Sequence, residues 1–438
     1  MLKKTYFRLL IYLSIWQLYL TFMQSHAPLG TDWLPWHFQR IYNFSEYLKL
    51  NGYFSNYGFS IWSICKDCSL DAGYEENKIY LSLYIFSNLP YVIINHYFGV
   101  ENLKLYGHLV DKIFIFITGS LIAELFLKLS KNKTKIENYA KAILCFSIFI
   151  IAPWTYKMLI GQWSIFYFLA FYLIGIFLFL NKKHKLGLLL FFISGLFDYQ
   201  SSAGLGTFYT LLLIIFSLKS EKNLNKYFFY NLDNNKMLNY KIAISLIVPA
   251  CIYFFLRFLA ENELQIVTGS SILTRIGISG NDVHNGSLLG ALQFLGGNRI
   301  TQCLAGFNIG IDLNDFSKSI FVYNCALSHA SMFLVSLISM IGIFILYKKN
   351  NSFFKLIAFP ILFLLSCYIF ILQQSSSVHL MGYSYLFSLL FSVGITSVIF
   401  KILEKYNFST ISILLITPAT IGVVLLCIRI SMLTGANG

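Results

Sequence analysis

The chain has 438 residues, of which 57% are hydrophobic, 18% are aromatic and only 12% are charged. Its mean hydropathy is +0.66. These values exclude a soluble enzyme and a nucleic-acid-binding domain, because such folds need a far larger share of polar surface. The formal net charge is +14, but the cations fall in short groups between long apolar runs. The composition therefore predicts an all-α, polytopic membrane protein.

A helix needs about 20 largely apolar residues to cross a bilayer. Windows of that size predict about 11 transmembrane helices. In chain order these are 6–23, 109–129, 140–160, 163–180, 186–197, 205–218, 242–259, 330–347, 353–372, 380–400 and 411–430. The fifth and sixth windows are short, which predicts tilted or broken helices.

The cations indicate how these helices are oriented. With a cytoplasmic N-terminus, 21 of the 33 Lys and Arg residues fall on the cytoplasmic side. They form groups at 3–8, 128–141, 182–185, 219–241, 348–355 and 401–405. This distribution follows the positive-inside rule and leaves two long outer loops, 24–108 and 260–329. Lysine is favoured over arginine, and Asn, Ile, Phe and Tyr are abundant, as in AT-rich bacterial coding sequence. We therefore expect a multi-pass protein of the bacterial cytoplasmic (inner) membrane.

The stretch 79–100 is apolar enough to span, but a span there would place the lysines at 128–141 outside. We therefore expect it to lie in the outer membrane interface, with Tyr80, Tyr84, Tyr91 and Tyr97 at headgroup level.

Four of the eight cysteines fall in the outer loops: Cys65, Cys68, Cys303 and Cys325. An even number of thiols on the oxidising side makes these four disulfide candidates, for example Cys65 with Cys68 and Cys303 with Cys325. Four cysteines allow three pairings, so the connectivity stays open. Zinc binding or redox activity at Cys65-Lys66-Asp67-Cys68 are the alternatives.

Asp32 lies just after the first predicted helix, next to Trp33 and close to Trp36. At that level a carboxylate can serve as general base, removing a proton from an acceptor that attacks a lipid-linked sugar. Burial against the indole rings would raise its pKa toward the working range. The alternative is an exposed turn residue beside an interfacial aromatic belt.

The organisation of the first 200 residues resembles the GT-C superfamily of integral-membrane glycosyltransferases. The resemblance lies in the early loop acid, the tract 79–84, and the turn Tyr97-Phe98-Gly99-Val100-Glu101-Asn102 leading into 105–129. Lysines from 128 to 135 close that helix. The resemblance implies a polyprenyl-phosphate-sugar donor, interfacial helices in the first outer loop and Asp32 as the catalytic acid. It implies a GT-C-like module, 1–220, whose catalytic outer loop is 24–108. A second module, 221–438, would carry an outer cover loop, 260–329.

A phosphate-linked donor needs cations beside its phosphate. Arg40, Arg275 and Arg299 are the candidates, and the alternative for each is a solvated loop charge. His379 opens the tenth predicted helix from the outside and is a substrate-contact candidate or an interfacial hydrogen-bonding residue. Asp198 marks the turn between the two short helices, where it binds sugar or caps a helix.

The leading hypothesis is thus transfer of a sugar from the lipid-linked donor to a glycan or lipid acceptor, with membrane lipids around the protein and no nucleic-acid partner. The alternatives are a lipid-linked oligosaccharide flippase or other transporter, and a polysaccharide polymerase or ligase. A transporter would carry internal repeats and ionisable residues within its helices. The sequence shows no cofactor signature and leaves the use of a divalent metal ion open.

Overall fold

The structure is a computed structural model that describes residues 2–26, 35–63, 79–129, 135–152, 154–155, 165–218, 236–263, 333–349, 351–368 and 377–405. These residues are almost entirely helical, which confirms the helical class. The long helices are α1 (Leu2–His26), α2 (Pro35–Asn51), α3 (Leu89–Phe98), α4 (Leu103–Leu129), α5 (Lys135–Ile151), α7 (Ile165–Leu180), α8 (His184–Phe197), α9 (Tyr199–Leu218), α11 (Lys236–Glu263) and α17 (Ser377–Lys405). A further helix, Phe333–Lys348, precedes the π-helical turn η5 (Phe354–Ala358) and α16 (Phe359–Ser366).

Helices are present at ten of the eleven predicted windows, and the eleventh, 411–430, lies outside the described residues. Two of the described helices, Tyr240–Glu263 and Tyr385–Lys405, are long and apolar enough to cross a membrane. Other apolar helices are shorter, at 10–17 residues. The count of about 11 membrane spans therefore stays a prediction.

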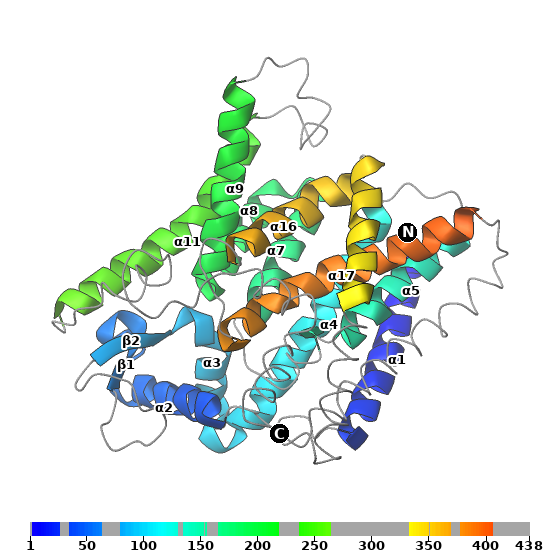
Figure 1. Ribbon diagram of the computed structural model, residues 1–438. Helices are drawn as coiled ribbons and strands as arrows, with labels where there is room; N and C mark the ends of the chain where they lie inside the picture. The colour runs from blue at the N-terminus through cyan, green and yellow to red at the C-terminus, as the bar shows by residue number, and fades with distance from the viewer. Residues whose placement is uncertain are drawn as a thin grey trace, which may run out of the picture.

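The centre of the bundle is built from α4, α5, α7 and α17, whose inward faces form one large apolar core. Aromatic side chains fill much of it. The Trp154 ring lies 4.7 Å from Phe387 and 5.0 Å from Phe391, while Tyr385 contacts both Phe149 and Phe166. These contacts join the C-terminal part of α5 and the start of α7 to the first half of α17. In Figure 1, α17 crosses the bundle beside these helices.

Helix Phe333–Lys348 packs on α17 through small residues. Gly342 and Gly394 face each other so closely that a Cβ on either one would overlap the backbone of the other helix. At the same crossing the Ser339 hydroxyl donates to the carbonyls of Leu390 and Phe391, at 3.2 Å each. Small residues at a helix crossing are typical of membrane proteins, where close backbone approach replaces the hydrophobic driving force.

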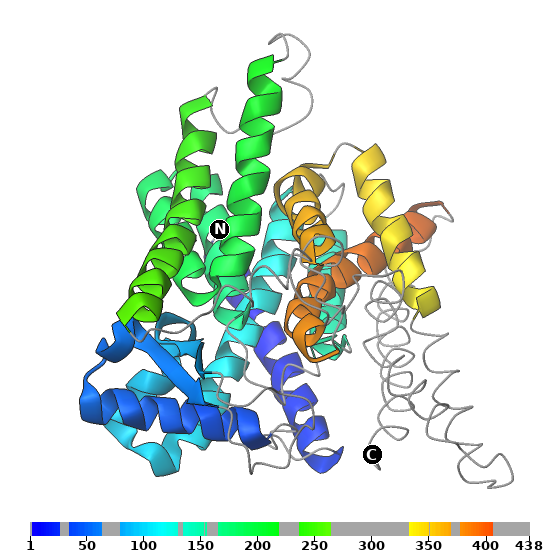
Figure 2. The same ribbon diagram turned by 60° about the vertical axis from the view of Figure 1, so that its left-hand side comes forward.

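The first predicted outer loop folds into a separate layer, which we name the cap (described residues 35–63 and 79–102). It contains α2, the short 3₁₀ helices η1 (Ser55–Gly58), η2 (Phe86–Asn88) and η3 (Val100–Asn102), and α3. Strands β1 (Phe59–Ser63) and β2 (Ile79–Tyr84) form an antiparallel hairpin, with Trp62 paired to Tyr80. Figures 1 and 2 both show the cap at one end of α4 and α11. This hairpin is the only β-sheet in the described part of the chain.

The cap corrects the expectation for 79–100. Its tyrosines do not all lie at a membrane surface: Tyr84 and Tyr91 are only 4% and 2% exposed, whereas Tyr97 is 74% exposed. The segment bends at Ile85 into η2 and α3; there the Ile85 N–H donates to the Gly58 carbonyl at 2.8 Å, and the Ile85 side chain packs closely against Gly58. Most of the segment is therefore packed against protein.

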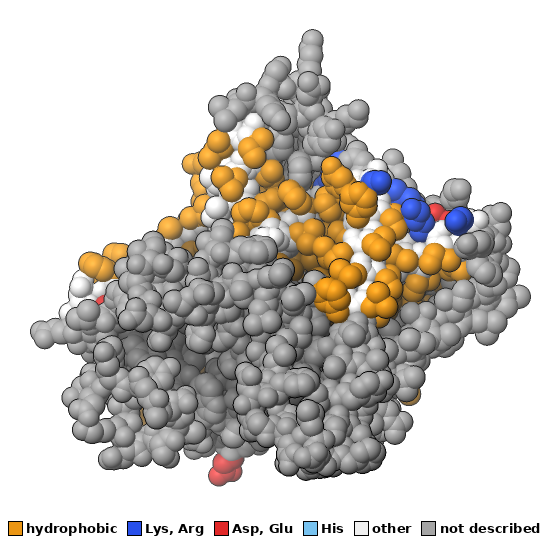
Figure 3. Space-filling view, viewed as in Figure 1, with side chains coloured by type: hydrophobic (Ala, Val, Ile, Leu, Met, Phe, Trp, Pro, Cys, Tyr) orange, Lys and Arg blue, Asp and Glu red, His pale blue; other side chains and the backbone are white. Residues whose placement is uncertain are grey.

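The opposite end of the bundle, which we name the basic end, joins groups that the cation pattern assigns to one side. Lys128 at the end of α4 donates to Asn181 in the α7–α8 turn at 2.7 Å. Lys349 and Lys141 both pair with Glu404 near the end of α17, at 3.4 and 4.0 Å. Figure 3 shows Lys and Arg side chains gathered where helix Phe333–Lys348 and α17 end. The helix ends are thus sorted into two groups, as the predicted alternation requires.

Between the two ends, the outward faces of the helices are apolar, as the hydrophobic area in Figure 3 illustrates. Helix Phe333–Lys348 exposes one stripe of large side chains, composed of Leu334, Leu337, Ile341, Phe344 and Tyr347, each at least 41% exposed. On α11, Phe255 and Phe258 are 61% and 59% exposed. Such stripes on several helices are unusual for a water-soluble surface and suit contact with lipid.

Candidate functional site

The cap is held on the bundle by an aromatic seam around Tyr253 of α11. The Tyr253 ring stacks on Tyr199 at 3.5 Å and contacts Phe59 at 5.4 Å and Tyr84 at 5.1 Å. A second apolar contact joins Ile41, Tyr91 and Ile94 of the cap to Leu103 at the start of α4. The first turns of α4 and α9 and the last turns of α11 therefore meet under the cap. We treat this region, the cap end, as the candidate site.

Asp198 lies at the cap end, between α8 and α9, and is only 5% exposed. Its carboxylate accepts the backbone N–H groups of Gln200 and Ser201 at 3.1 and 3.3 Å, and the Ser201 hydroxyl at 2.6 Å. Burial raises the pKa of Asp198, and these donors partly oppose that rise. The geometry is that of an N-cap at the start of α9, which is the capping alternative of the sequence. A sugar contact by Asp198 stays a prediction.

The first turn of α9 also forms hydrogen bonds to residues of two other helical segments, α11 and the turn after α16. The Ser201 hydroxyl lies 2.7 Å from the Tyr368 hydroxyl, which follows α16. On the other side of α9, Ser202 donates to the Leu246 carbonyl at 2.5 Å, in the turn that precedes Pro249 of α11. A proline disrupts helical hydrogen bonding, so a side-chain donor from a neighbouring helix stabilises this turn. The first turn of α9, which Asp198 caps, is thus hydrogen-bonded both to α11 and to the residue Tyr368 after α16.

A second buried carboxylate, Asp111, was not among the sequence candidates. It lies eight residues after the start of α4, about 12 Å along the helix at 1.5 Å per residue. Tyr91 of α3 donates a hydrogen bond to its Oδ2 and Tyr167 of α7 donates one to its Oδ1. All three residues are buried: Asp111 is 1% exposed, Tyr91 is 2% exposed, and Tyr167 is also buried. The signal that could have found Asp111 is an acidic residue inside an apolar window, since such residues are costly and have partners.

Asp111 and Asp198 belong to one neighbourhood. The Tyr167 ring, which binds Asp111, lies 5.1 Å from the ring of Phe197, the residue before Asp198. The cation Arg257, near the end of α11, donates to Glu261 at 2.6 Å and to the Tyr253 hydroxyl at 3.0 Å. Arg257 was not among the sequence candidates, and it lies within the predicted span 242–259. The described cap end therefore holds two buried carboxylates and one paired arginine.

Two more sequence candidates have backbone positions in the structure. Arg40 lies in α2 of the cap, and His379 lies in the first turn of α17. The first half of α17 faces the end of α5 and the start of α7, so His379 begins its helix on the cap side of the bundle. Their side chains lie outside the description, and so no contact is assigned to either.

The remaining candidates lie outside the described residues. They are Asp32, Arg275, Arg299, Cys65, Cys68, Cys303 and Cys325. Among the described cysteines, Cys145, Cys251 and Cys367 are free thiols within helical segments. Within the described ranges no three His, Cys, Asp or Glu residues lie close enough together to hold a metal ion.

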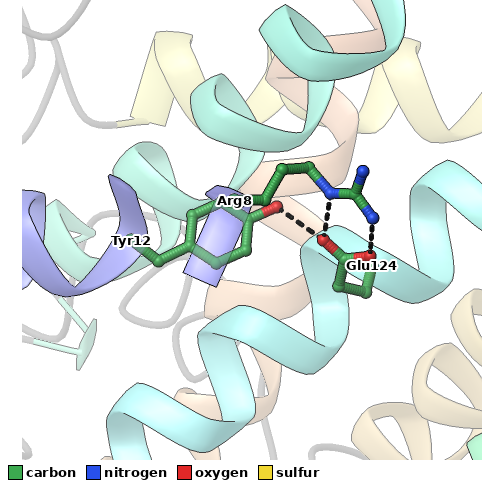
Figure 4. A network of polar contacts seen from close by, with 3 residues as sticks. All are labelled: Arg8, Tyr12 and Glu124. Atoms are coloured by element: carbon green, nitrogen blue, oxygen red, sulfur yellow. Dashed lines mark hydrogen bonds and ion pairs between the residues drawn. The ribbon is translucent and has the colours of Figure 1, made fainter. Parts of the chain in front are cut away.

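The basic end has its own buried polar network, shown in Figure 4. Arg8 of α1 forms two bonds to Glu124 of α4, and the Tyr12 hydroxyl donates to the same carboxylate at 3.1 Å. The Arg8 guanidinium also lies 5.2 Å from the centre of the Tyr139 ring of α5. This network joins three helices, and both carboxylate oxygens of Glu124 have partners within it, so we interpret it as structural.

Comparison with protein-family models, curated proteins and solved structures gives no match. The class defined by the geometry is a helical bundle with apolar outward faces, a basic end, and a cap over the opposite end.

Proposed function

We propose that this protein is a polytopic glycosyltransferase of the bacterial cytoplasmic membrane that uses a polyprenyl-phosphate-linked sugar at the outer face. One observation carries the proposal. The chain between α1 and α4 forms a folded cap over the end of the bundle opposite the lysines, and Asp32 lies three residues before the cap begins at Pro35. This is the organisation that the resemblance to GT-C enzymes implies for a catalytic first outer loop.

The membrane location rests on two supports. Large apolar side chains are exposed along α1, α4, α9, α11 and helix Phe333–Lys348, where lipid would solvate them. The lysines gather at the end away from the cap, as the positive-inside rule requires when the cap is outside. Together with the apolar windows of the sequence, these supports lead us to propose about 11 spans and a cytoplasmic N-terminus.

In the proposed reaction Asp32 removes the proton from the acceptor hydroxyl, whose oxygen attacks the anomeric carbon of the donor sugar. The new glycosidic bond forms as the bond between that carbon and the phosphate oxygen breaks, and the polyprenyl phosphate leaves with the electron pair. Arg40, Arg275 and Arg299 are the cations proposed to stabilise the leaving phosphate. Asp198 and His379 are proposed sugar contacts.

The test is product formation in membranes supplied with a polyprenyl-phosphate-linked sugar, together with donor affinity. Asp32→Asn keeps size and hydrogen bonding but removes the proton acceptor, so turnover should fall about 100-fold or more while donor binding survives. Arg299→Ala should instead weaken donor binding through a lost phosphate contact. Near wild-type turnover in a correctly inserted Asp32→Asn protein would reject the catalytic role and favour the alternative, in which Asp32 is an exposed turn residue at the membrane interface.

A transporter of lipid-linked oligosaccharide is the second candidate, and the buried Asp111 favours it. Ionisable residues inside membrane helices often mark transport pathways. However, Asp111 lies in the third turn of α4 and Glu124 lies near its opposite, basic end, and each is bound to its own partners. Flipping of a labelled lipid in proteoliposomes, without sugar transfer, would favour the transporter.

A further inference from the structure

A buried polar joint connects the cap to the bundle, and it is centred on Asp111. Its two carboxylate oxygens are shared between helices with different positions: Oδ2 accepts from Tyr91 of the cap, and Oδ1 accepts from Tyr167 of the bundle. Its neighbour Lys112, which is partly buried, also acts electrostatically on Asp111. The joint is enclosed, with Asp111 1% and Tyr91 2% exposed.

The other described contacts between cap and bundle are mainly apolar. They include the aromatic seam around Tyr253 and the cluster of Ile41, Tyr91, Ile94 and Leu103. A further hydrogen bond joins Tyr57 of η1 to Glu263, which is exposed at the end of α11. Apolar contact is not directional, so it holds two surfaces together without defining one alignment. A buried, charge-assisted hydrogen bond is directional, and it is lost when the partners shift by a fraction of its length. The Tyr91–Asp111 bond is therefore suited to set the alignment of the cap.

The helix surface of α4 is shaped for this bond. Gly107 lies one turn before Asp111, and a Cβ on Gly107 would overlap the Tyr91 ring. The missing side chain leaves a notch through which Tyr91 reaches the carboxylate. Within the cap, Asn95, one turn after Tyr91, donates to Glu46 of α2 at 2.7 Å. The alignment of Tyr91 is thereby transmitted to α2, the helix that contains Arg40.

We propose that Asp111 is a positioning residue: by binding Tyr91 against the notch at Gly107, it fixes where the cap lies over the bundle. Where it concerns turnover, this inference rests on the proposed function, because the cap follows Asp32 and contains Arg40. Where it concerns the cap itself, it stands on the contacts alone.

The experiment compares two matched changes, Tyr91→Phe and Tyr167→Phe, in the full chain in detergent micelles or nanodiscs. Each removes one hydroxyl from the same carboxylate, but only the first removes a bond between cap and bundle. Amide hydrogen exchange in α3 should become about 10- to 100-fold faster in Tyr91→Phe. In Tyr167→Phe it should stay within about 3-fold of wild type. Equal effects on α3, or none in Tyr91→Phe, would overturn the proposal.

Gly107→Ala tests the joint from the α4 side, because its methyl group displaces the Tyr91 ring without changing a polar atom. It should reproduce the faster amide exchange of α3. It therefore also serves as the test variant if Tyr91→Phe yields too little folded protein. In the sugar-transfer assay, Tyr91→Phe should lower kcat about 10-fold with little change in donor KM, whereas Tyr167→Phe should not. If wild type transfers no sugar, the proposed function fails, and the exchange data still decide the role of Asp111.

Discussion

The guanidinium of Arg8 and the carboxylate of Glu124 form a two-bond ion pair, with Nε–Oε1 and Nη2–Oε2 distances of 2.6 Å each. The two side chains are only 12% and 14% exposed. Removing one partner of such a pair leaves the other charge buried and unsatisfied. The pair therefore fastens the first helix to α4.

We expect Arg8→Ala to lower the free energy of unfolding by about 3 kcal/mol, because Glu124 loses its counter-charge. Lys349→Ala is the control, since the Lys349–Glu404 pair is 55% and 53% exposed and such pairs contribute about 0–1 kcal/mol. Thermal unfolding of the purified protein in detergent measures both. An Arg8→Ala effect no larger than that of Lys349→Ala would show that the Arg8–Glu124 pair does not stabilise the packing of α1 on α4.

The crossing of Gly342 and Gly394 predicts a strong steric effect. A methyl group in Gly394→Ala would overlap the backbone carbonyl of Ser339, so the two helices must separate and the mutant should unfold at clearly lower temperature. Gly204→Ala in α9 is the matched control, because its methyl group meets only the end of the Leu364 side chain, at 2.6 Å. The control should be near neutral, since Ala is the better helix former by about 1 kcal/mol. Similar thermal stability of the two mutants would argue against the close crossing.

The proposed topology is tested by labelling single engineered cysteines in intact cells, in a background without native thiols. Asn51 in the cap and Lys182 in the α7–α8 turn are both exposed, so accessibility does not bias the comparison. A membrane-impermeant reagent should modify Asn51→Cys and leave Lys182→Cys unmodified until the cells are opened. Labelling at Lys182, or at Lys133, in intact cells would invalidate the eleven-helix arrangement.

The disulfide candidates are tested by mass mapping of non-reduced protein. We expect Cys303 and Cys325 to be joined, which by the chain-entropy estimate contributes about 3 kcal/mol for a loop of about 20 residues. Cys145 serves as the internal control, since it is a buried free thiol 3.8 Å from the Ser392 hydroxyl. Finding Cys303 and Cys325 as free thiols would reject this pairing.

The sequence by itself determined where helices form and which helix ends lie together. Apolar windows are local features, so the window 242–259 marks the centre of α11, and the window 380–400 lies within α17. The lysine groups likewise anticipated that residues near 128 and 182, and those near 349 and 404, share one end of the bundle. Both inferences need only composition along the chain.

Only the tertiary structure decided which polar groups meet. Tyr91 and Tyr167 are 20 and 56 residues from Asp111, and nothing in their local sequence marks them as its partners. Their meeting depends on the rotation of three helices about their axes and on the notch at Gly107. In the same way, Tyr84 lies in a segment that reads as interfacial, yet the hairpin turns it into the seam with Tyr253. Hydropathy predicts which residues are removed from water, but the packing of neighbouring helices decides whether those residues contact lipid or other parts of the protein.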